Sequence, residues 1–408
     1  MKSRGCFTGS LSSQQLIELD ACTQCGECLT FCPIQDVNSK PSISPPEKIR
    51  VFREFIKATE GLKARLFGPR DIDRKLLEEF TKAVFECTTC GACGQHCTVG
   101  IFSQRLWPQL RKEMVRRGIG PIGGQAKMPE VIRNTGNPYN LPAKDRFDPW
   151  FPAAVEVAET ADTAYYAGCT GAYSAQPMVK GDVLVLKAAG EPFTMLPPED
   201  EVCCGFPLFV SGQHDMLEDL IKRLVEAYRA KGVKMLLCSC PCCVNIMSRD
   251  WPIFYGQKLP FKIRHMTQFA AEALRSGKLK IRRELPERLI YHDPCYLSRG
   301  VGITEEPRII LRSIPGVQLI EFDRYGVNSR CCGAGGAARK VYPENANAIG
   351  RSTIDEAVKK KADRLIFSCP ACYAQVNEGM LNHDRQIRIA DIMELLSSLI
   401  EQDENSAS

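Results

Sequence analysis

Ten cysteines in the C-terminal two-thirds of the chain form two sets of five with nearly the same spacing. Each set has an isolated cysteine, an adjacent pair followed by glycine, and a closing C-x-x-C. The first set is Cys169, Cys203, Cys204, Cys240 and Cys243, and the second is Cys295, Cys331, Cys332, Cys369 and Cys372. Five converging thiolates are more than one tetrahedral zinc ion can use. The pattern therefore predicts an iron–sulfur assembly at each set.

Two further cysteine motifs near the N-terminus have the C-x2-C-x2-C-x3-C spacing of ferredoxins. The first is followed by Pro33, whereas the second has Thr98 in place of the usual proline. In two-cluster ferredoxins the fourth cysteine of each motif binds the other cluster. We therefore expect two cubane [4Fe–4S] clusters, one held by Cys22, Cys25, Cys28 and Cys97 and the other by Cys87, Cys90, Cys93 and Cys32. Zinc sites fit less well, because zinc does not require these offsets.

The elements around these N-terminal motifs are predicted to be helical. Residues 46–57 and 73–85 have apolar residues at helical intervals, and a Gly/Pro-punctuated stretch from Gly61 to Pro69 separates them. Residues 118–152 are rich in Gly, Pro and Asn, which is typical of a linker. The sequence thus predicts an α-helical ferredoxin-like domain over residues 1–150.

The two sets of five cysteines are offset by 126 to 129 residues, which indicates an internal duplication. In each copy, apolar runs alternate with helical segments. In the first copy one helical segment ends near Gly190 and the other spans 216–231; in the second copy one ends before Pro315 and the other spans 344–361. The expected strands are 163–167, 193–196 and 233–237 in the first copy and 288–291, 317–322 and 364–367 in the second. This alternation predicts two α/β domains with parallel sheets, at 151–285 and 286–408, the second including an acidic, disordered tail from Glu401. Loops that follow parallel strands meet at one edge of a sheet, so the cysteines can converge.

Composition limits the class of protein. The 408 residues are 25% charged and 44% hydrophobic, with a net charge of +5 and 21 cysteines. The basic run 111–117 is expected to be a solvated helix face, because no basic stripe is interleaved with aromatic residues, and no nucleic-acid partner is expected. No leader peptide and no run of 18 apolar residues are found, so we expect a cytoplasmic protein with metal-bound thiolates, docked on the membrane only through a partner.

Other residues give weaker signals. The segment Gly333–Ala338 fits G-x-G-x-x-A, but it follows a cysteine pair, so close backbone packing around a cluster explains it better than nucleotide binding. Two histidines are candidate proton donors or structural residues, and three cysteines are candidate spare thiols: His214, His292, Cys6, Cys238 and Cys242. A different choice of ligand pair within 238–243 is conceivable, but the second copy favours Cys240 and Cys243.

The two sets of five cysteines match the cysteine-rich CCG motif of heterodisulfide reductases. With the two ferredoxin motifs before them, and with the segment 61–69, the chain resembles the catalytic D subunits of these enzymes in methanogenic archaea over about residues 15 to 395. The resemblance implies that each set of five holds a noncubane [4Fe–4S] cluster. It also implies that the two clusters face one another and split the mixed disulfide of coenzyme M and coenzyme B.

The same resemblance implies a hetero-oligomer in which a membrane cytochrome b subunit supplies electrons through the cubanes. Because disulfide reduction takes two electrons and a cluster relay delivers them singly, two metal sites could each hold one cleaved sulfur. The alternative is a non-catalytic electron-transfer subunit of a hydroxy-acid or glycerol-3-phosphate dehydrogenase, with a flavin-containing partner, or of a membrane complex linked to sulfite reduction. Both sets of five are complete here, which favours chemistry on sulfur.

Overall fold

The computed structural model describes residues 6–381 and 383–400, so the predicted disordered tail lies outside the described residues. The chain divides into two compact units. Unit 1 comprises residues 1–129, 207–215 and 330–349, and unit 2 comprises residues 130–206, 216–329 and 350–408. None of the described helices is both long and apolar enough to span a membrane.

Helices make up the part of the chain before the first strand. They are α1 (Ser13–Ala21), α2 (Pro33–Val37), α3 (Pro45–Glu60), α4 (Leu62–Phe67), α5 (Arg74–Glu86), α6 (Ala92–Gln95), α7 (Ser103–Arg116) and α8 (Met128–Thr135), with the short 3-10 helices η1 (Glu27–Phe31), η2 (Pro41–Ile43), η3 (Gly123–Lys127) and η4 (Ala143–Arg146). The two predicted long helices are therefore confirmed as α3 and α5.

Local sequence explains where α3 and α5 begin. The Ser44 hydroxyl accepts a hydrogen bond from the Glu47 amide at 3.3 Å, and prolines occupy the first turn of α3, where no amide hydrogen is needed. The Asp73 carboxylate caps α5 in the same way, through the Lys75 amide. Both helices bury phenylalanines in an aromatic core of unit 1 made by Phe7, Phe52, Phe55, Phe80 and Phe85.

Two N-terminal expectations need correction. The stretch 61–69 contains the helix α4 between its glycines. The predicted linker 118–152 is also structured, because Met128 and Ile132 lie one turn apart on α8 and are buried, and Trp150 joins the core of unit 2. Apolar side chains at helical spacing outweigh the high content of glycine and proline here.

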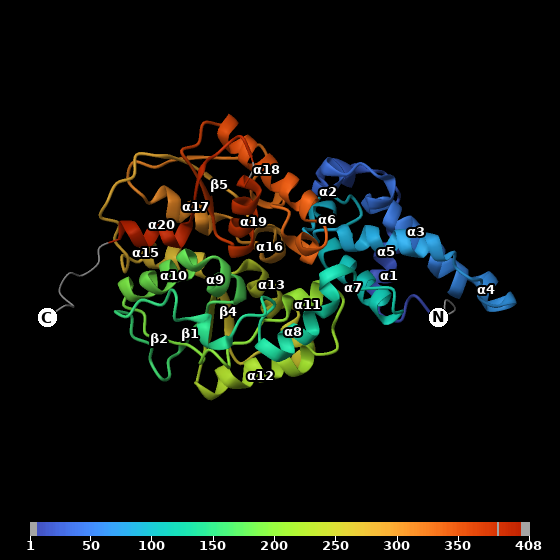
Figure 1. Ribbon diagram of the computed structural model, residues 1–408, viewed down its shortest axis with the longest axis horizontal. Coiled ribbons are helices and arrows are strands. Elements are labelled where there is room, and N and C mark those ends of the chain that lie inside the picture. Colours follow the sequence, from blue (N-terminus) through green and yellow to red (C-terminus); the bar gives the residue numbers. More distant parts are fainter. Residues whose placement is uncertain (1–5, 382, 401–408) are drawn as a thin grey trace. The chain divides into compact units, whose positions relative to one another are not determined.

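Unit 2 contains two four-stranded sheets in which every strand pair is parallel (Figure 1), as the sequence predicted. The first sheet has the order β2-β1-β3-β4 and the second β6-β5-β7-β8. The strands are β1 (Thr163–Tyr166), β2 (Phe193–Thr194), β3 (Met235–Cys238), β4 (Lys262–His265), β5 (Arg288–Tyr291), β6 (Gln318–Ile320), β7 (Arg364–Phe367) and β8 (Arg388–Asp391).

The strands β4 and β8 were not predicted. Both lie at the edge of a sheet and begin with exposed basic residues, Lys262 and Arg388. Edge strands commonly carry charge, which prevents pairing with other chains. They therefore lack the apolar run by which the central strands can be recognised.

Helices follow the strands in both repeats. The first repeat has α9 (Cys169–Ser174), α10 (Gln176–Ala188), α11 (Phe206–Val210), α12 (Leu217–Ala230), α13 (Pro241–Arg249), α14 (Trp251–Tyr255) and α15 (Met266–Arg275). The second has α16 (Cys295–Val301), α17 (Glu305–Arg312), α18 (Pro343–Lys359), α19 (Pro370–Met380) and α20 (Ile392–Leu399), with η5 (Gly326–Asn328) and η6 (Gly335–Lys340).

The two repeats pack on one another reciprocally within unit 2. Helix α10 packs on α20 and α15 on α17, while α13 packs on α16 and α19 on α9 (Figure 1). The first two contacts are equivalent, because α17 is the counterpart of α10 and α20 is the counterpart of α15. A single apolar core runs through both sheets and the helices α10, α15, α17 and α20.

Candidate metal centres

The first set of five cysteines gathers at one edge of the first sheet. Cys169 begins α9 after β1, and Cys240 precedes α13 after β3. These two strands are neighbours, and the connections that leave them run to opposite sides of the sheet, which opens a crevice in parallel sheets. All five cysteines are buried. The sheet thus brings together residues more than 70 positions apart.

The five thiols contact one another in a continuous series. The side chain of Cys169 interacts with that of Cys203, Cys203 with Cys204, Cys204 with Cys243, and Cys243 with Cys240. Hydrogen bonds from Cys203 and Cys243 lower the pKa of the Cys204 thiol to about 6. The neighbouring thiols and burial instead raise the pKa values of Cys169, Cys203 and Cys243. A close group of buried sulfur donors fits a site that binds metal.

The series continues into the second repeat. The Cys240 side chain interacts with that of Cys369, which in turn interacts with Cys372. Cys242 also contacts both Cys240 and Cys369. The C-x-x-C segments of the two repeats therefore meet within unit 2.

A buried ion pair supports the first site. The Arg146 guanidinium lies 3.8 Å from the Cys169 sulfur and 3.2 Å from the Glu201 carboxylate, which accepts a hydrogen bond from the Gly168 amide. Burial raises the pKa of Glu201 to about 7, and Arg146 opposes the rise. Sequence reasoning missed both residues, because no motif marks them and their contacts with the site are made only in the folded chain.

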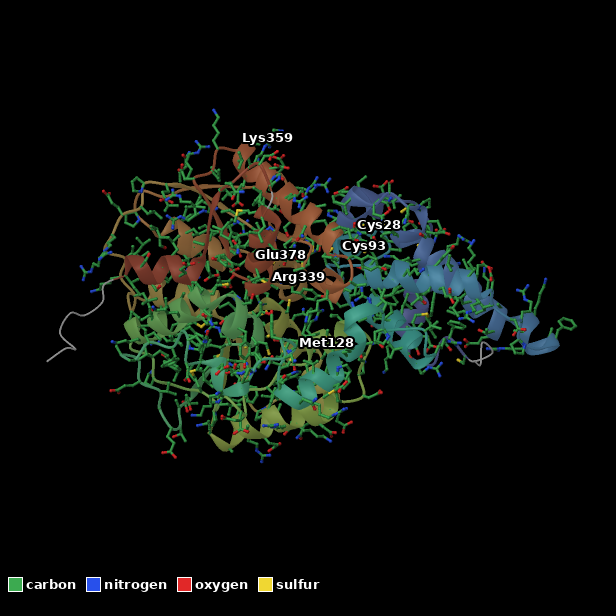
Figure 2. The ribbon with its side chains drawn as sticks, in the orientation of Figure 1. Cys28, Cys93, Met128, Arg339, Lys359 and Glu378 are labelled. Carbon is green, nitrogen blue, oxygen red and sulfur yellow. The ribbon has the colours of Figure 1, made fainter. Side chains whose placement is uncertain are left out.

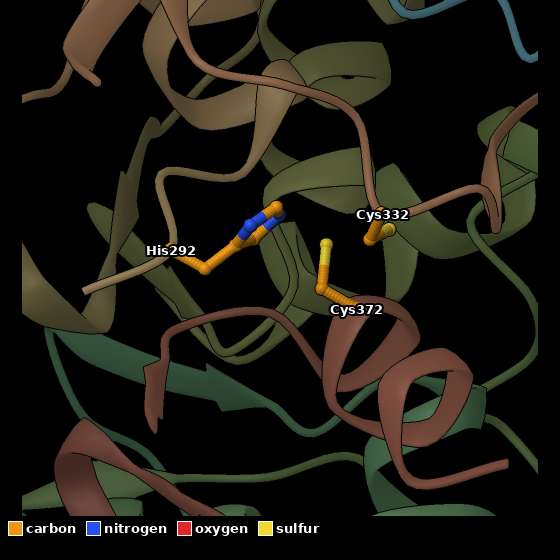
Figure 3. A group of neighbouring side chains, drawn as sticks. All are labelled: His292, Cys332 and Cys372. Atoms are coloured by element: carbon orange, nitrogen blue, oxygen red, sulfur yellow. The ribbon is translucent and has the colours of Figure 1, made fainter. Parts of the chain in front are cut away.

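The second set is divided between the two units. Cys295, Cys369 and Cys372 lie in unit 2, where His292 also lies after β5. A ring nitrogen of His292 is within 4.8 Å of the Cys372 sulfur, and the two side chains point toward one another (Figure 3). The His292 Nε2 atom is buried and has no hydrogen-bond partner among the described residues. His292 and Cys372 therefore fit a site in which a bound metal, or a further hydrogen-bond acceptor, contacts the His292 ring nitrogen.

Cys331 and Cys332 lie in unit 1, on a glycine-rich segment that packs closely on the second ferredoxin motif. Gly333 has a φ of +94°, and a side chain there would meet the Ala346 carbonyl at 2.6 Å. A side chain at Gly335 would collide with the Thr88 carbonyl, and one at Gly336 would meet the Cys87 carbonyl at 2.5 Å. The glycines thus allow close approach of two backbones.

The two ferredoxin motifs interleave around two adjoining cavities in unit 1. The first cavity is lined by Cys22, Cys25, Cys28 and Cys97, with Cys93 also at its wall. The second is lined by Cys32, Cys87, Cys90 and Cys93. Figure 2 labels Cys28 and Cys93, which come from different motifs.

The surroundings of Trp107 indicate whether these cavities suit an iron–sulfur cluster. Its ring lines both cavities, and its buried Nε1 donor has no hydrogen-bond partner among the residues that the structure describes. An N–H group without a protein acceptor fits the sulfur of a bound cluster. The cavities are therefore suited to iron–sulfur clusters in both the type and the arrangement of their donors.

The remaining candidates have ordinary surroundings. The His214 ring stacks on Phe209, its Nε2 lies 3.0 Å from the Phe209 carbonyl, and burial lowers its pKa to about 4. The Cys238 thiol donates to the Met247 sulfur at 3.6 Å, inside the core. Cys6 is exposed and contacts Thr8 and Glu60.

One sequence expectation about charge is wrong. The run 111–117 is not a solvated face, because Arg111 and Glu113 are fully buried. Glu113 binds Arg116 and Arg117, at 2.7 and 2.6 Å. Amino-acid composition alone does not distinguish charged residues on a buried helix face from charged residues on an exposed face.

Comparison with known proteins agrees with this geometry. A model of the CCG cysteine-rich domain matches residues 163–248 and 289–377, and a 4Fe–4S dicluster domain matches residues 18–101. The chain is 39% identical over 397 residues to the D subunit of the dihydromethanophenazine:CoB–CoM heterodisulfide reductase of Methanosarcina acetivorans, covering 96% of this chain and 97% of that one. The chain belongs to the family of heterodisulfide reductase D subunits.

Heterodisulfide reductase D subunits are iron–sulfur proteins of an oxidoreductase, and membership implies a complex with other subunits. A more distant relative, the B subunit of the fumarate reductase (CoM/CoB) of Methanothermobacter marburgensis, is 28% identical and covers 96% of this chain and 74% of that one. The fold is shared with a hypothetical protein from Helicobacter pylori, whose crystal structure gives a TM-score of 0.54 at 10% identity and covers 96% of this chain and 75% of that one.

Proposed function

We propose that this protein is the catalytic subunit of a heterodisulfide reductase. It reduces a disulfide of the CoM-S-S-CoB type to two thiols, with electrons relayed from a membrane cytochrome b partner. The observation that carries the proposal is the contact of Cys240 with Cys369, since it joins the cysteine sets of both repeats in one unit. Adjoining sets would place both sulfurs of one disulfide within reach of the two sites.

The ligands follow from the motifs and their placement. Cubane clusters are assigned to the first cavity, through Cys22, Cys25, Cys28 and Cys97, and to the second, through Cys32, Cys87, Cys90 and Cys93. The two sets of five are assigned to two noncubane clusters. Bound clusters would supply one-electron transfer and iron sites for sulfur.

The protein itself supplies burial, position and a route. All ten cysteines of the two sets are buried, which keeps water from the reacting sulfur. The Cys87 and Thr88 backbone packs on Gly335 and Gly336, three or four residues after the Cys331–Cys332 pair. This packing gives electrons a short covalent and van der Waals route from the second cubane site toward a CCG pair.

Relatives support the same substrate class. The name of the Methanosarcina acetivorans relative includes the CoB–CoM heterodisulfide, and that of the Methanothermobacter marburgensis relative includes CoM/CoB. An EtfAB:quinone oxidoreductase of Syntrophomonas wolfei is 24% identical and covers 95% of this chain and 59% of that one. This last likeness favours the alternative in which the chain passes electrons between other centres.

The deciding experiment is an anaerobic assay of the purified, cluster-loaded protein with reduced viologen and the coenzyme heterodisulfide. We expect viologen oxidation with release of two thiols per disulfide. Absence of turnover in protein whose clusters are intact by EPR spectroscopy would refute catalysis and favour the electron-transfer alternative.

A further inference from the structure

The two cubane sites of unit 1 differ in the charges placed around them. Lys48 on α3 is 2% exposed and lines the second cavity beside Cys32 and Cys87. Its Nζ atom lies 4.7 Å from the centre of the Trp107 ring. Lys48 is thus a buried cation at the wall of the second site.

Arg111 brings a second buried cation to the same site. Its guanidinium donates to the carbonyl oxygen of Cys87, a proposed ligand of the second cluster, and to that of Val84 at 2.9 and 3.0 Å. The same group donates to the carbonyls of Val210 at 2.7 Å and Gly336 at 2.6 Å. Main-chain carbonyls hold the guanidinium in place but leave its full charge in the protein.

A buried carboxylate lies next to a proposed ligand of the second site. Glu86 precedes Cys87 and is 6% exposed. Its Oε1 atom accepts hydrogen bonds from the side-chain amides of Asn38 at 2.7 Å and Asn345 at 2.5 Å. Both cations and this carboxylate are thus buried in the part of unit 1 that holds the second site.

The described wall of the first site has no comparable buried cation. Among the described residues that line its cavity, none is lysine or arginine, and one is Glu27. Arg53 donates to the Cys22 carbonyl at 3.1 Å, but it also pairs with Asp20 at 3.4 Å, and its side chain is 28% exposed. Solvent screens this arginine, and its charge is matched by that of Asp20.

Charge near a cluster sets how easily the cluster accepts an electron. Reduction adds one negative charge, so a nearby buried cation stabilises the reduced form and raises the reduction potential. Solvent near the exposed Cys25 also stabilises added charge at the first site. A full positive charge in a low-dielectric interior acts more strongly than solvent at the exposed edge of the first site.

We propose that Lys48 and Arg111 make the second cubane site the more easily reduced of the two, so that electrons pass from the first site to the second. The inference rests on the ligand assignment proposed above. A cluster held at the first site would lose one electron and a cluster at the second site would gain it, with no bond or proton moved. The proposed one-electron donor, the cytochrome b partner, would then return an electron to the first site.

This order of electron transfer brings electrons to the cubane site that lies next to the Cys331–Cys332 pair. The second site adjoins the glycine-rich segment that follows Cys331 and Cys332, and Arg111 binds both Cys87 and Gly336. Lys48 and Arg111 therefore supply positive charge at fixed positions beside the second site. Their role is to set the potential of the second cluster and not to act on the disulfide.

The test is a redox titration of the full-length, cluster-loaded protein, with dithionite and mediators, followed by EPR. Two cubane midpoint potentials are expected. Lys48→Met should shift the higher potential to a more negative value and leave the lower one nearly unchanged. Lys48→Arg should restore the wild-type value, because it keeps the charge.

Lys57→Met is the matched control, since Lys57 lies on the same helix and is exposed. It should move neither potential. A Lys48→Met protein whose higher potential is unchanged, or whose lower potential shifts instead, would overturn the inference. If this variant does not hold its clusters, Lys48→Gln decides by the same titration. Wild-type protein without two cubane signals would contradict the ligand assignment, whereas an unshifted variant with both signals contradicts the inference alone.

Discussion

The Tyr165 hydroxyl lies 2.6 Å from the Ser239 hydroxyl, and the bond ties the end of β1 to the residue before Cys240. The second repeat has the same bond, also 2.6 Å long, between Tyr291 and Ser368, the residue before Cys369. Both bonds are buried. Each repeat therefore fixes the start of its C-x-x-C segment through the neighbouring strand, at the point where the two segments meet.

Removal of one of these hydroxyls should destabilise the fold. In Tyr165→Phe, the partners Ser239 and Asp182 lose a buried hydrogen bond. We expect a loss of about 1–3 kcal/mol in the free energy of unfolding, measured as a lower melting temperature of the loaded protein. Tyr325→Phe is the control, because Tyr325 is 52% exposed. The melting temperature of this variant should equal that of the wild type. Equal melting of both variants would contradict a structural role for the Tyr165 bond.

Asp182 should make stability depend on pH. Burial raises its pKa to about 7, from the value of 3.8 for a free side chain. Between about pH 4 and pH 7 the folded state therefore holds a proton that the unfolded state has lost, so stability falls as pH rises through this range. In Asp182→Asn the free energy of unfolding should fall less steeply as pH rises, by up to about 1.4 kcal/mol per pH unit. Denaturant unfolding of both proteins from pH 4 to pH 8 measures the difference, and parallel curves would contradict it.

The paired cysteines should be required for turnover but not for the cubanes. Cys204→Ala and Cys332→Ala each remove one thiolate from a set of five, so we expect loss of disulfide reduction with both cubane EPR signals retained. Cys6→Ala, which removes an exposed thiol, should keep wild-type activity. Loss of the cubane signals alone in either paired-cysteine variant would contradict the assignment of ligands.

Cys240 and Cys242 should respond differently although both contact Cys369. Cys240 belongs to the thiol series of the first set, whereas Cys242 lies beside it. We expect Cys240→Ala to lower the iron content per chain and Cys242→Ala to leave it unchanged. Iron and sulfide analysis after anaerobic purification gives the result. Lower iron in Cys242→Ala with full iron in Cys240→Ala would reverse the choice of ligand.

Gly181 on α10 should tolerate no side chain. A Cβ atom there would lie 2.5 Å from the Glu394 amide nitrogen on α20, and backbone atoms cannot move aside as a flexible side chain can. Gly181→Ala should destabilise the protein by about 1–3 kcal/mol. Gly124→Ala meets no atom within 4 Å and is the control. Thermal unfolding compares the two, and an unchanged Gly181→Ala protein would argue against close contact of α10 with α20.

The sequence predicted the central parts of the fold well, for a physical reason. Strands such as 288–291 and 364–367 are largely buried, so they appear as apolar runs, and the cysteines mark the loops that follow them. The edge strands β4 and β8 carry charge and have no such run. The cubane motifs were recognisable because cluster geometry requires fixed local spacing.

Supporting residues could not be predicted in this way. Lys48, Arg111 and Arg146 act through burial and through neighbours that are distant in the chain. A single buried cation has no periodic pattern, and the sequence around Arg111 has the charge content of a surface helix. Their roles become visible only when the three-dimensional contacts are known.

The reciprocal packing of the two repeats bears on how such a chain could have arisen. Each repeat buries its α10-type and α15-type helices against the other repeat, so one repeat alone would leave two apolar faces open to water. A shorter ancestor with a single repeat could have covered those faces by forming a symmetric homodimer, in which the same patch serves both partners. Fusion of two gene copies would then have made that association permanent and allowed the halves to diverge.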